Sequence, residues 1–480
     1  MPAGATGGAT GKMQRPARSA TFNGMATASS PAADEKGQRY PLSFTQEWFL
    51  TLDQGDDGGT FGSRFTMVRP IQITGRVDLA VLQGALDDVV ARHELLRTVV
   101  VRDADPPYQH VFPPCQVPLK VRDIPPATGK SRGTMLQDLL YESGVVNARE
   151  VPLMDARLYK FDDRDSVMFL TVHHSACDAW SSEVILRDLG AFYAARITGT
   201  AAELPPVRQY REYAEWQRAS ATSSAEDGAP AYWRDKLSGA REFTIPNDHG
   251  HPESYARPYS QRAHAIEADV MAKASALATA SRTTLFPVLL SAFYVLAYQD
   301  TGATDLTIRA FTAGREVEQF HNTMGLFLNC VPFRTDIADC TSFRDIVAHA
   351  KETFFGAMAH ELPVNVIEQS FPDFVKSRDD LRTSQFIISP QVSQLGEELI
   401  LPIADGARPI AVRWRDEDGP RDIPSGTVWF VDVPAVGPLA GVVMFNLEEF
   451  DESTVAGWIT DLQRILAKAV SDPDQDWKTL

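Results

Sequence analysis

The chain has few cysteines, a deficit of positive charge and no long hydrophobic run. Its 480 residues include 4 scattered cysteines, which argues against a disulfide framework and favours a reducing compartment. No apolar stretch reaches membrane-spanning length, and no secretory signal is visible. Because Lys+Arg number 46 against 63 for Asp+Glu, the formal net charge of -17 offers nucleic acid no broad basic surface. We therefore expect a cytoplasmic protein without nucleic-acid or membrane partners.

The length and the apolar fraction predict more than one lobe around large cores. A chain of 480 residues, 44% of them hydrophobic, is too long for one ordinary domain. Residues 1–39 are rich in small and polar residues without periodicity, so we expect a disordered tail. A Ser-rich stretch at 219–230 is the best candidate for a linker. The prediction is an N-terminal lobe over 40–218 and a C-terminal lobe over 231–475.

The strongest local signal is a buried strand that ends in two histidines. Val167 to Val172 is an uninterrupted apolar or β-branched run, typical of a strand covered on both faces. His173 and His174 follow, and a helical pattern begins after Asp178. One face of that helix would carry Val184, Ile185, Leu189, Phe192, Tyr193 and Ile197, with Gly199 as the C-terminal cap. The order strand, tight turn, helix presents titratable groups at the edge of a core.

The two histidines are expected to have different roles, because neighbouring side chains at a strand end point in opposite directions. One interpretation is a satisfied core pair beside Asp178 as an ordinary helix cap. Another is a metal site with Cys177, which is disfavoured because adjacent histidines rarely chelate one ion and no second Cys/His cluster is present. The third, which we favour, is a general base fixed by its surroundings. We expect no metal.

Residues 103–135 contain three Pro-Pro pairs and are expected to be rich in loops. Within them, Gly129 to Gly133 spells G-x-S-x-G, but no apolar strand precedes it, so it is not a nucleophile elbow. Further on, the patterns predict strands at 259–266, 305–311 and 384–389, a hairpin of 426–433 with 439–447, and helices at 268–280, 284–299, 342–360 and 451–470.

The string His173-His174-x-x-x-Asp178-x-Trp180-Ser181 resembles the active-site motif of condensation domains of nonribosomal peptide synthetases, members of the chloramphenicol-acetyltransferase-like superfamily. Companion strings resemble other motifs of that family, in the same order: Pro41 to Trp48, Arg92 to Thr98, Tyr210 to Trp216, Met324 to Arg334 and His360 to Pro363. The resemblance covers residues 41–470. Ala179 stands where the family usually has glycine, which puts a standard substrate geometry in doubt.

The resemblance implies an α/β fold, an α+β sandwich of two chloramphenicol-acetyltransferase-like lobes in a V-shaped pseudo-dimer with a central tunnel. It implies that His174 is the base or positioner, with His173 and Asp178 in the same catalytic motif. Asp178 is expected to be structural and to pair with an arginine, for which Arg97 and Arg315 both remain candidates.

Three further residues are expected to contact the substrate: Asn329, Trp180 and Ser181. Asn329 would line the tunnel, and a buried amide in an apolar strand needs hydrogen-bond partners. Backbone N–H groups at the start of the helix, including that of Asp178, are expected to meet the oxyanion.

The resemblance implies an enzyme with no bound cofactor, whose donor is carried on phosphopantetheine. Nothing in the sequence resembles a carrier serine motif, an adenylation domain or a thioesterase, so a separate peptidyl or acyl carrier protein is the expected partner. We expect a condensation enzyme that transfers an aminoacyl group to a hydroxyl or amine of a small-molecule acceptor in natural-product biosynthesis. It is similar to enzymes of enediyne assembly that esterify a β-amino acid. The alternatives are a CoA-dependent acyltransferase, a non-catalytic recruitment module and an epimerase-like relative.

Overall fold

The computed structural model describes residues 38–56, 58–125, 130–224, 228–250, 259–380, 382–391, 400–410, 412, 426–432 and 438–480. Residues Gly37–Leu480 form one unit. The fold is mixed α/β, as the sequence predicts. Of the predicted tail, residues 1–37 lie outside the described residues, while Gln38–Tyr40 form strand β1. Strand β1 therefore begins two residues before the predicted boundary at residue 40.

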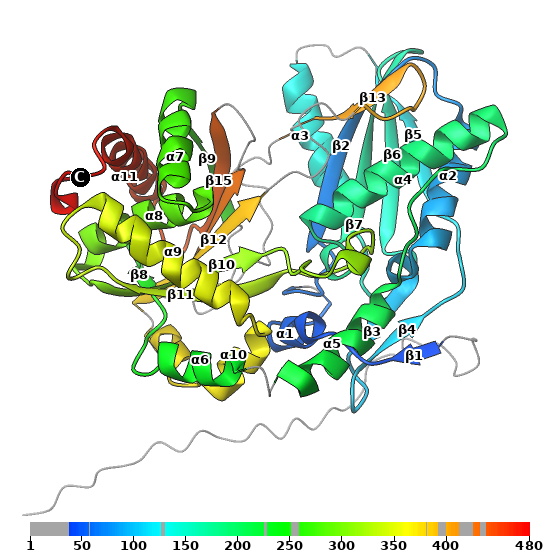
Figure 1. Ribbon diagram of the computed structural model, residues 1–480. Coiled ribbons are helices and arrows are strands. Elements are labelled where there is room, and N and C mark those ends of the chain that lie inside the picture. The colour runs from blue at the N-terminus through cyan, green and yellow to red at the C-terminus, as the bar shows by residue number, and fades with distance from the viewer. Residues whose placement is uncertain are drawn as a thin grey trace, which may run out of the picture. The chain divides into compact units, whose positions relative to one another are not determined.

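A five-stranded sheet in the order β13-β2-β7-β6-β5 carries the histidine stretch on its central strand (Figure 1). Its strands are β2 (Thr66–Thr74), β5 (Leu119–Asp123), β6 (Met154–Lys160), β7 (Asp165–His173) and β13 (Gly406–Pro409). Strand β7 is antiparallel to both neighbours, with His173 opposite Thr66 of β2 and Val172 opposite Met154 of β6. The end of the strand is thus held from both sides.

Helices cover both faces of this sheet, which explains the continuous apolar run in β7. They are α2 (Leu79–Arg92), α3 (Arg132–Ser143) and α4 (Ala179–Thr198). Val167 and Phe169 share a core cluster with α3, whereas Met168 and Leu170 share one with α2 and α4. The alternation continues to Thr171, whose hydroxyl donates to a carbonyl at the end of α3. The strand thereby fixes the direction in which each histidine leaves it.

Polar side chains or a glycine mark three of the helix ends, and Gly199 ends its helix as the sequence predicts. Ser43 and Gln46 form a capping box at the start of α1 (Phe44–Thr51), and the Asp78 carboxylate accepts backbone N–H bonds at the start of α2. Gly199 ends α4 with φ of 70°, a left-handed conformation that glycine adopts without a Cβ clash.

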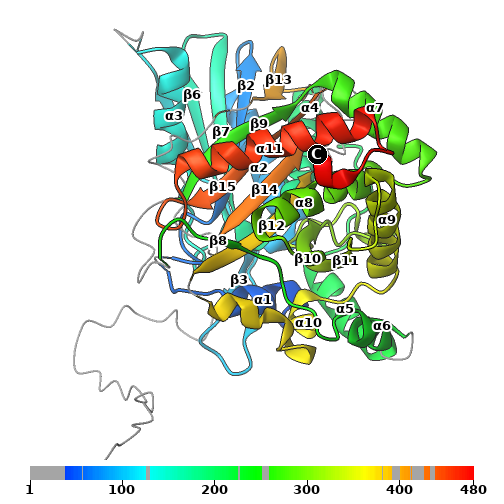
Figure 2. The ribbon, with the colours of Figure 1, turned by 90° about the vertical axis from the view of Figure 1, so that its left-hand side faces the viewer.

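The second large sheet has the order β11-β10-β12-β14-β15-β9, with β8 paired to β12. Its strands are β8 (Thr244–Pro246), β9 (Tyr259–Ile266), β10 (Asp305–Thr312), β11 (Asn329–Asp336), β12 (Thr383–Gln391), β14 (Thr427–Asp432) and β15 (Leu439–Asn446). Four helices join it in one apolar core, with α11 towards the viewer in Figure 2: α7 (Ala268–Ala280), α8 (Leu285–Thr301), α9 (Phe343–Ala359) and α11 (Glu452–Ser471). The elements predicted for this half are confirmed.

A small sheet and three further helices lie outside the two large sheets. The sheet has the order β1-β4-β3, with β3 (Thr98–Val101) and β4 (Tyr108–Val111). The helices are α5 (Tyr210–Ser224), α6 (Ala229–Lys236) and α10 (Val364–Ser370).

The structure differs from the predicted organisation at the linker and at the end of the C-terminal lobe. The linker predicted over 219–230 is helical up to Ser224, and α6 begins at Ala229, because small residues such as Ala and Ser can continue a helix. The region 103–135, predicted to be rich in loops, contains β4, β5 and the start of α3, where Ser131 is the helix cap, and residues 112–118 between the two strands form no helix or strand. The C-terminal lobe runs past residue 475, since Trp477 is buried in its core.

Strand β13 comes from the C-terminal part of the sequence but completes the N-terminal sheet. Gly406 to Pro409 pair with Ile71 to Thr74 of β2, antiparallel. Leu401 and Ile403 belong to the apolar core of the same sheet. The two halves of the chain are therefore joined by a shared sheet as well as by the connection at 219–230.

No single helix among the described residues is long and apolar enough to cross a membrane. Helices α7 and α8 would be long and apolar enough only if taken together, and the chain bends by 110° between them.

Candidate active site

The turn after β7 holds the ring of His174 in a fixed plane. His174 opens a 3₁₀ turn, His174–Ala176, and its backbone N–H donates to the Phe65 carbonyl at 2.8 Å. Its imidazole stacks on the Phe65 ring, with centroids 4.8 Å apart and an interplanar angle of 14°, and Phe49 meets it edge-on at 6.2 Å. The side chain keeps partial solvent access, although Nδ1 itself is buried. Nδ1 of His174 has no hydrogen-bond partner among the described residues.

His173 is fully buried and turned into the protein. The backbone N–H of Ser175 donates to its Nδ1 at 3.2 Å, so Nδ1 is an acceptor and Nε2 carries the proton. Nε2 in turn donates to the Gly62 carbonyl at 3.1 Å. Burial lowers the pKa of His173 to about 4, which keeps the ring neutral. Both ring nitrogens are used by the protein.

His174 is also held in its neutral form. Burial lowers its pKa, while backbone groups of His174 and Cys177 and the negative charge of Asp178 act in the opposite direction with less effect. A neutral imidazole with an accessible nitrogen can accept a proton.

Asp178 is the N-terminal cap of α4, and its carboxylate accepts hydrogen bonds from three residues. Its carboxylate accepts from the Ser181 N–H at 2.7 Å and from the Phe327 N–H at 3.1 Å. Arg315 Nη2 donates to both oxygens, at 3.1 and 3.3 Å. One carboxylate thus ties the turn after β7, the start of α4 and the segment before β11 together.

The structure places Arg315, and not Arg97, beside Asp178. Nη1 of Arg315 donates to the carbonyls of Thr323, at 2.7 Å, and Phe320, at 3.1 Å. Arg97 instead donates to the Phe112 carbonyl and lies 3.8 Å from a Glu94 oxygen. Arg97 therefore supports β3 and β4, away from the histidine turn.

Ser181 and Trp180 face the protein, in contrast to the prediction that they bind substrate. The Ser181 hydroxyl donates to the Gly325 carbonyl at 2.8 Å and accepts from the Gly325 N–H and from Arg315. Ser181 is also fully buried, and its hydroxyl is engaged by these contacts within the protein. Trp180 donates from Nε1 to the His321 carbonyl at 2.9 Å and lies beside the Arg315 guanidinium.

Asn329 opens β11 and has the partners that its burial requires. Its Nδ2 donates to Glu361 Oε1 at 2.8 Å and to the Leu362 carbonyl at 2.9 Å, and its Oδ1 accepts from the Val364 N–H at 2.8 Å. Asn329 lies in the wall of a pocket of about 300 Å³. The pocket is bounded by α1, α5, α10 and the segment that carries Arg315.

Two residues at the site carry roles that the residue pattern alone did not indicate. Tyr210 donates to the Leu326 carbonyl at 2.6 Å and bonds the Ser43 hydroxyl at 2.7 Å, so it connects α1, α5 and the segment before β11. Gly325 lies so close to the Tyr210 ring that a Cβ would approach it to 2.1 Å. The resemblance of Tyr210 to Trp216 and of Met324 to Arg334 to family motifs is the signal that could have found this contact.

The string Arg92 to Thr98 supports helix α4 through Asp188. Asp188 of α4 accepts from Arg92 at 2.8 Å and Arg187 at 2.8 Å, and it lies 2.9 Å from His93 Nε2. Burial lowers the pKa of His93, against the pull of Asp188. These contacts fix the helix whose N-terminus faces the histidine turn.

The residues of the disfavoured metal interpretation do not converge. Both nitrogens of His173 have protein partners, and the Cys177 thiol donates to the Asp178 carbonyl at 3.2 Å. Burial raises the pKa of that thiol well above its usual range. Over the described ranges, no group of three or more His, Cys, Asp or Glu side chains could hold a metal ion.

Comparison with known proteins finds one family model that matches most of the chain. Residues 36–397 match the model described as Condensation domain. Chondramide synthase cmdD of Chondromyces crocatus is 29% identical over 441 residues, 90% of this chain and 11% of the synthase. The dimodular nonribosomal peptide synthase of Bacillus subtilis is 28% identical over 94% of this chain and 19% of that protein. The chain thus spans a small part of the curated relatives it matches.

A solved structure of similar size also matches. SgcC5 protein from Streptomyces globisporus, in a complex with (R)-(-)-1-(2-naphthyl)-1,2-ethanediol and sucrose, is 32% identical with a TM-score of 0.81. The match covers 91% of this chain and 100% of that one. The first condensation domain of the calcium-dependent antibiotic synthetase has a TM-score of 0.72 over 92% of this chain and 99% of its own, and at 16% identity it shows the shared fold.

Proposed function

Because the chain belongs to the condensation-domain family, we propose that it moves an aminoacyl group from a phosphopantetheine thioester to a small-molecule acceptor. The thioester is carried by a separate peptidyl or acyl carrier protein. The acceptor supplies a hydroxyl or an amine, and the product is an ester or an amide.

One observation carries this proposal: His174 is the partly exposed member of the histidine pair, with a neutral ring held in a fixed plane, and we propose that its Nε2 faces the substrate. Both ring nitrogens of His173 are already hydrogen-bonded, to Ser175 and to Gly62. A base of this kind is useful when a neutral hydroxyl or amine attacks a thioester, because the nucleophile loses a proton as the bond forms.

The proposed reaction balances without a further reactant. The acceptor oxygen or nitrogen attacks the thioester carbonyl while Nε2 of His174 takes its proton. The tetrahedral intermediate then expels the thiolate, which receives that proton from the imidazolium and leaves as the carrier thiol. Backbone N–H groups at the start of α4, including that of Asp178, are proposed to stabilise the oxyanion.

Asp178 and Arg315 are proposed to position His174 and to take no part in the proton transfer. Their ion pair is buried and joins the histidine turn to the segment before β11, so it sets where His174 lies relative to the pocket wall. Trp180 and Ser181 belong to the same support through His321 and Gly325. Asn329 holds Glu361 and the start of α10 at the pocket.

The ester-forming variant of this reaction has the stronger support. The SgcC5 structure, at 32% identity over nearly the whole chain, contains an aryl vicinal diol, a molecule with two hydroxyl groups and no amine. We propose an aryl 1,2-diol as the acceptor class and a β-aminoacyl group as the donor, as in enediyne assembly.

The test is product analysis with purified components. The chain is mixed with a carrier protein loaded with a β-aminoacyl group and with 1-(2-naphthyl)-1,2-ethanediol or the matching amino alcohol, and the products are identified by mass spectrometry. We expect an ester of the diol and its loss in His174→Ala. Equal turnover with an acyl-CoA donor would favour the CoA-dependent acyltransferase. No acyl transfer with any donor would favour a recruitment module.

A further inference from the structure

The pocket beside Asn329 has a wall built of aromatic rings. We call it the aromatic pocket, after Phe44, Tyr213, Trp216, Phe320 and Phe327 in its lining. Tyr213 and Trp216 stack with centroids 5.9 Å apart at 26°, and Phe320 meets the Tyr213 ring edge-on at 5.3 Å. Its volume of about 300 Å³ suits a molecule with one aromatic ring and a short chain.

A carboxylate in this wall has one oxygen without a partner. Glu361 Oε1 accepts from Asn329 Nδ2 and from the Thr312 hydroxyl, each at 2.8 Å. Oε2 is buried and has no hydrogen-bond partner among the described residues. A buried acceptor left unpaired is costly, so a donor at this position would be stabilising.

The charges around the pocket favour a cation as that donor. Burial and the nearby Glu316 carboxylate both raise the pKa of Glu361. Arg315 also lines the pocket, but its Nη atoms are directed to Asp178, Ser181 and two carbonyls. A positive ligand between the two carboxylates would reduce their repulsion, and the aromatic faces would add a cation–π attraction.

We propose that the aromatic pocket is a binding site for a primary ammonium group carried on an aryl-alkyl skeleton, with the ammonium donating to Glu361 Oε2 and the ring packing on Tyr213 and Trp216. This inference deepens the proposed function, since the amino group would be that of the aminoacyl substrate. The binding itself does not depend on catalysis, because none of the lining residues is the proposed base.

The first experiment compares two probes on the unmodified chain by isothermal titration calorimetry at neutral pH. The probes are 2-phenylethylamine, which is cationic, and 2-phenylethanol, its neutral counterpart of nearly the same size. We expect the amine to bind about tenfold more tightly, because a charge-assisted hydrogen bond is stronger than a neutral one. Equal affinities, or tighter binding of the alcohol, would overturn the proposal without the use of any variant.

Variants then assign the preference to particular side chains. In Glu361→Gln, which keeps the shape and one acceptor oxygen, the preference for the amine is expected to fall below about threefold. In Trp216→Leu both probes should weaken alike, since the ring contacts both, and Glu316→Gln should have a smaller effect than Glu361→Gln because Glu316 is exposed. An undiminished preference in folded Glu361→Gln would contradict the assignment.

A last variant separates this inference from the proposed reaction. His174→Ala should bind both probes as the unmodified chain does. If the amine preference persists while no acyl transfer is found with any donor, the proposed function fails and the binding site stands. If acyl transfer occurs but the two probes bind equally, the proposed binding site fails and the proposed function stands.

Discussion

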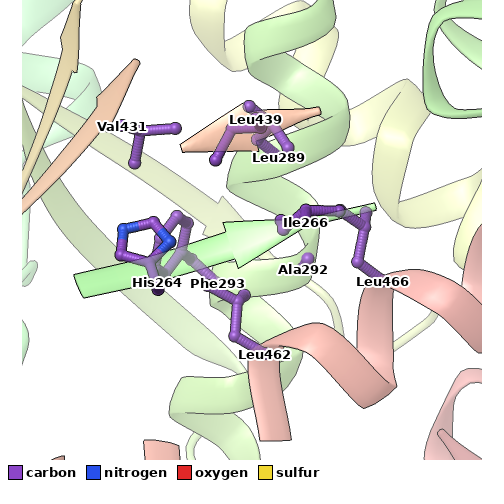
Figure 3. Close-up of a pocket in the computed structure, with 9 residues that line it drawn as sticks. All are labelled: His264, Ile266, Leu289, Ala292, Phe293, Val431, Leu439, Leu462 and Leu466. Carbon is purple, nitrogen blue, oxygen red and sulfur yellow. The ribbon is translucent and has the colours of Figure 1, made fainter. Parts of the chain in front are cut away.

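Two histidines, one on strand β9 and one in the turn after strand β7, show what distinguishes a usable imidazole from a structural one. His264 lies on β9 among aliphatic side chains from α8, β14, β15 and α11, as Figure 3 shows. Its Nε2 lies 3.0 Å from the Phe430 carbonyl, and the cavity beside it holds only about 10 Å³. His174, in contrast, follows a strand end, stacks on one ring and retains partial solvent access.

Burial lowers the pKa of both histidines, so the two are alike in protonation at neutral pH. They differ in what surrounds them. His264 has an apolar cavity with room for about one water molecule, whereas His174 is followed within four residues by a carboxylate that gathers three donors. Access and a rigid polar frame, more than the pKa, therefore mark a histidine suited to proton transfer.

The largest expected effect is the loss of acyl transfer in His174→Ala. Removal of the base should lower turnover by roughly 10²–10⁴-fold, while His264→Gln should remain within a few-fold of the unmodified chain. Steady-state rates with a loaded carrier protein measure both. Since the pKa of His174 is lowered from 6.5, the rate should be level above that pH and fall only at more acidic values, where the ring gains a proton. Near-native turnover in His174→Ala would exclude the role proposed for it.

The next largest effect is expected for the buried ion pair between Arg315 and Asp178. Arg315→Met leaves the buried Asp178 carboxylate without its charge partner, and we expect the free energy of unfolding to fall by about 3–5 kcal/mol. Urea denaturation followed by fluorescence measures this. The double variant Arg315→Met with Asp178→Asn should recover part of the loss, because the uncompensated charge is gone. Arg97→Met, at a pair that is not directed to the histidine turn, should cost less.

His173 should make the fold sensitive to acid. Its pKa is about 4 in the folded chain and about 6.5 when unfolded, so below pH 6.5 the unfolded state binds the proton more readily. The stabilisation is complete above the unfolded value and is lost as the pH falls from 6.5 towards 4, by up to roughly 3 kcal/mol.

The check on this prediction is the free energy of unfolding measured across that pH range. His173→Asn should flatten the dependence, whereas His249→Gln, at an exposed site, should leave it unchanged. An equal slope in His173→Asn and the unmodified chain would assign the acid sensitivity to other groups.

The smallest effect is expected for Tyr210→Phe. The variant keeps the ring packing against Gly325 but leaves the Leu326 carbonyl and the Ser43 hydroxyl without this partner, at a cost of about 1–3 kcal/mol. Thermal denaturation of Tyr210→Phe against Tyr141→Phe, at an exposed tyrosine, measures the difference. Equal melting temperatures would show that the hydroxyl is not a structural link.

Local patterns predicted much of this fold because caps and periodicity are short-range properties. The run Val167 to Val172 reads as a covered strand from its own residues, and Asp78 and Gly199 mark helix ends through their side chain or its absence. The choice between Arg97 and Arg315 could not be made in this way. Arg97 precedes Asp178 in the sequence and Arg315 follows it, and only the folded chain shows that Arg315 lies beside it.

Three features were beyond the reach of the sequence for physical reasons. The pairing of β13 with β2 joins residues far apart in the chain, and four residues carry no pattern that names a partner strand. The inward direction of Ser181 depends on Gly325, which lies in another element. Glu361 Oε2 has no partner because Thr312 and Asn329, which come from two other segments, both donate to Oε1.

The shared sheet has a consequence for how the chain is made. Strand β2 is synthesised long before Gly406 to Pro409, which later cover its outer edge. During that interval a growing polypeptide exposes a row of unsatisfied backbone groups, a surface prone to pairing with the wrong strand. Expression of the N-terminal half by itself should accordingly yield insoluble material, and co-expression with the remaining half should rescue it.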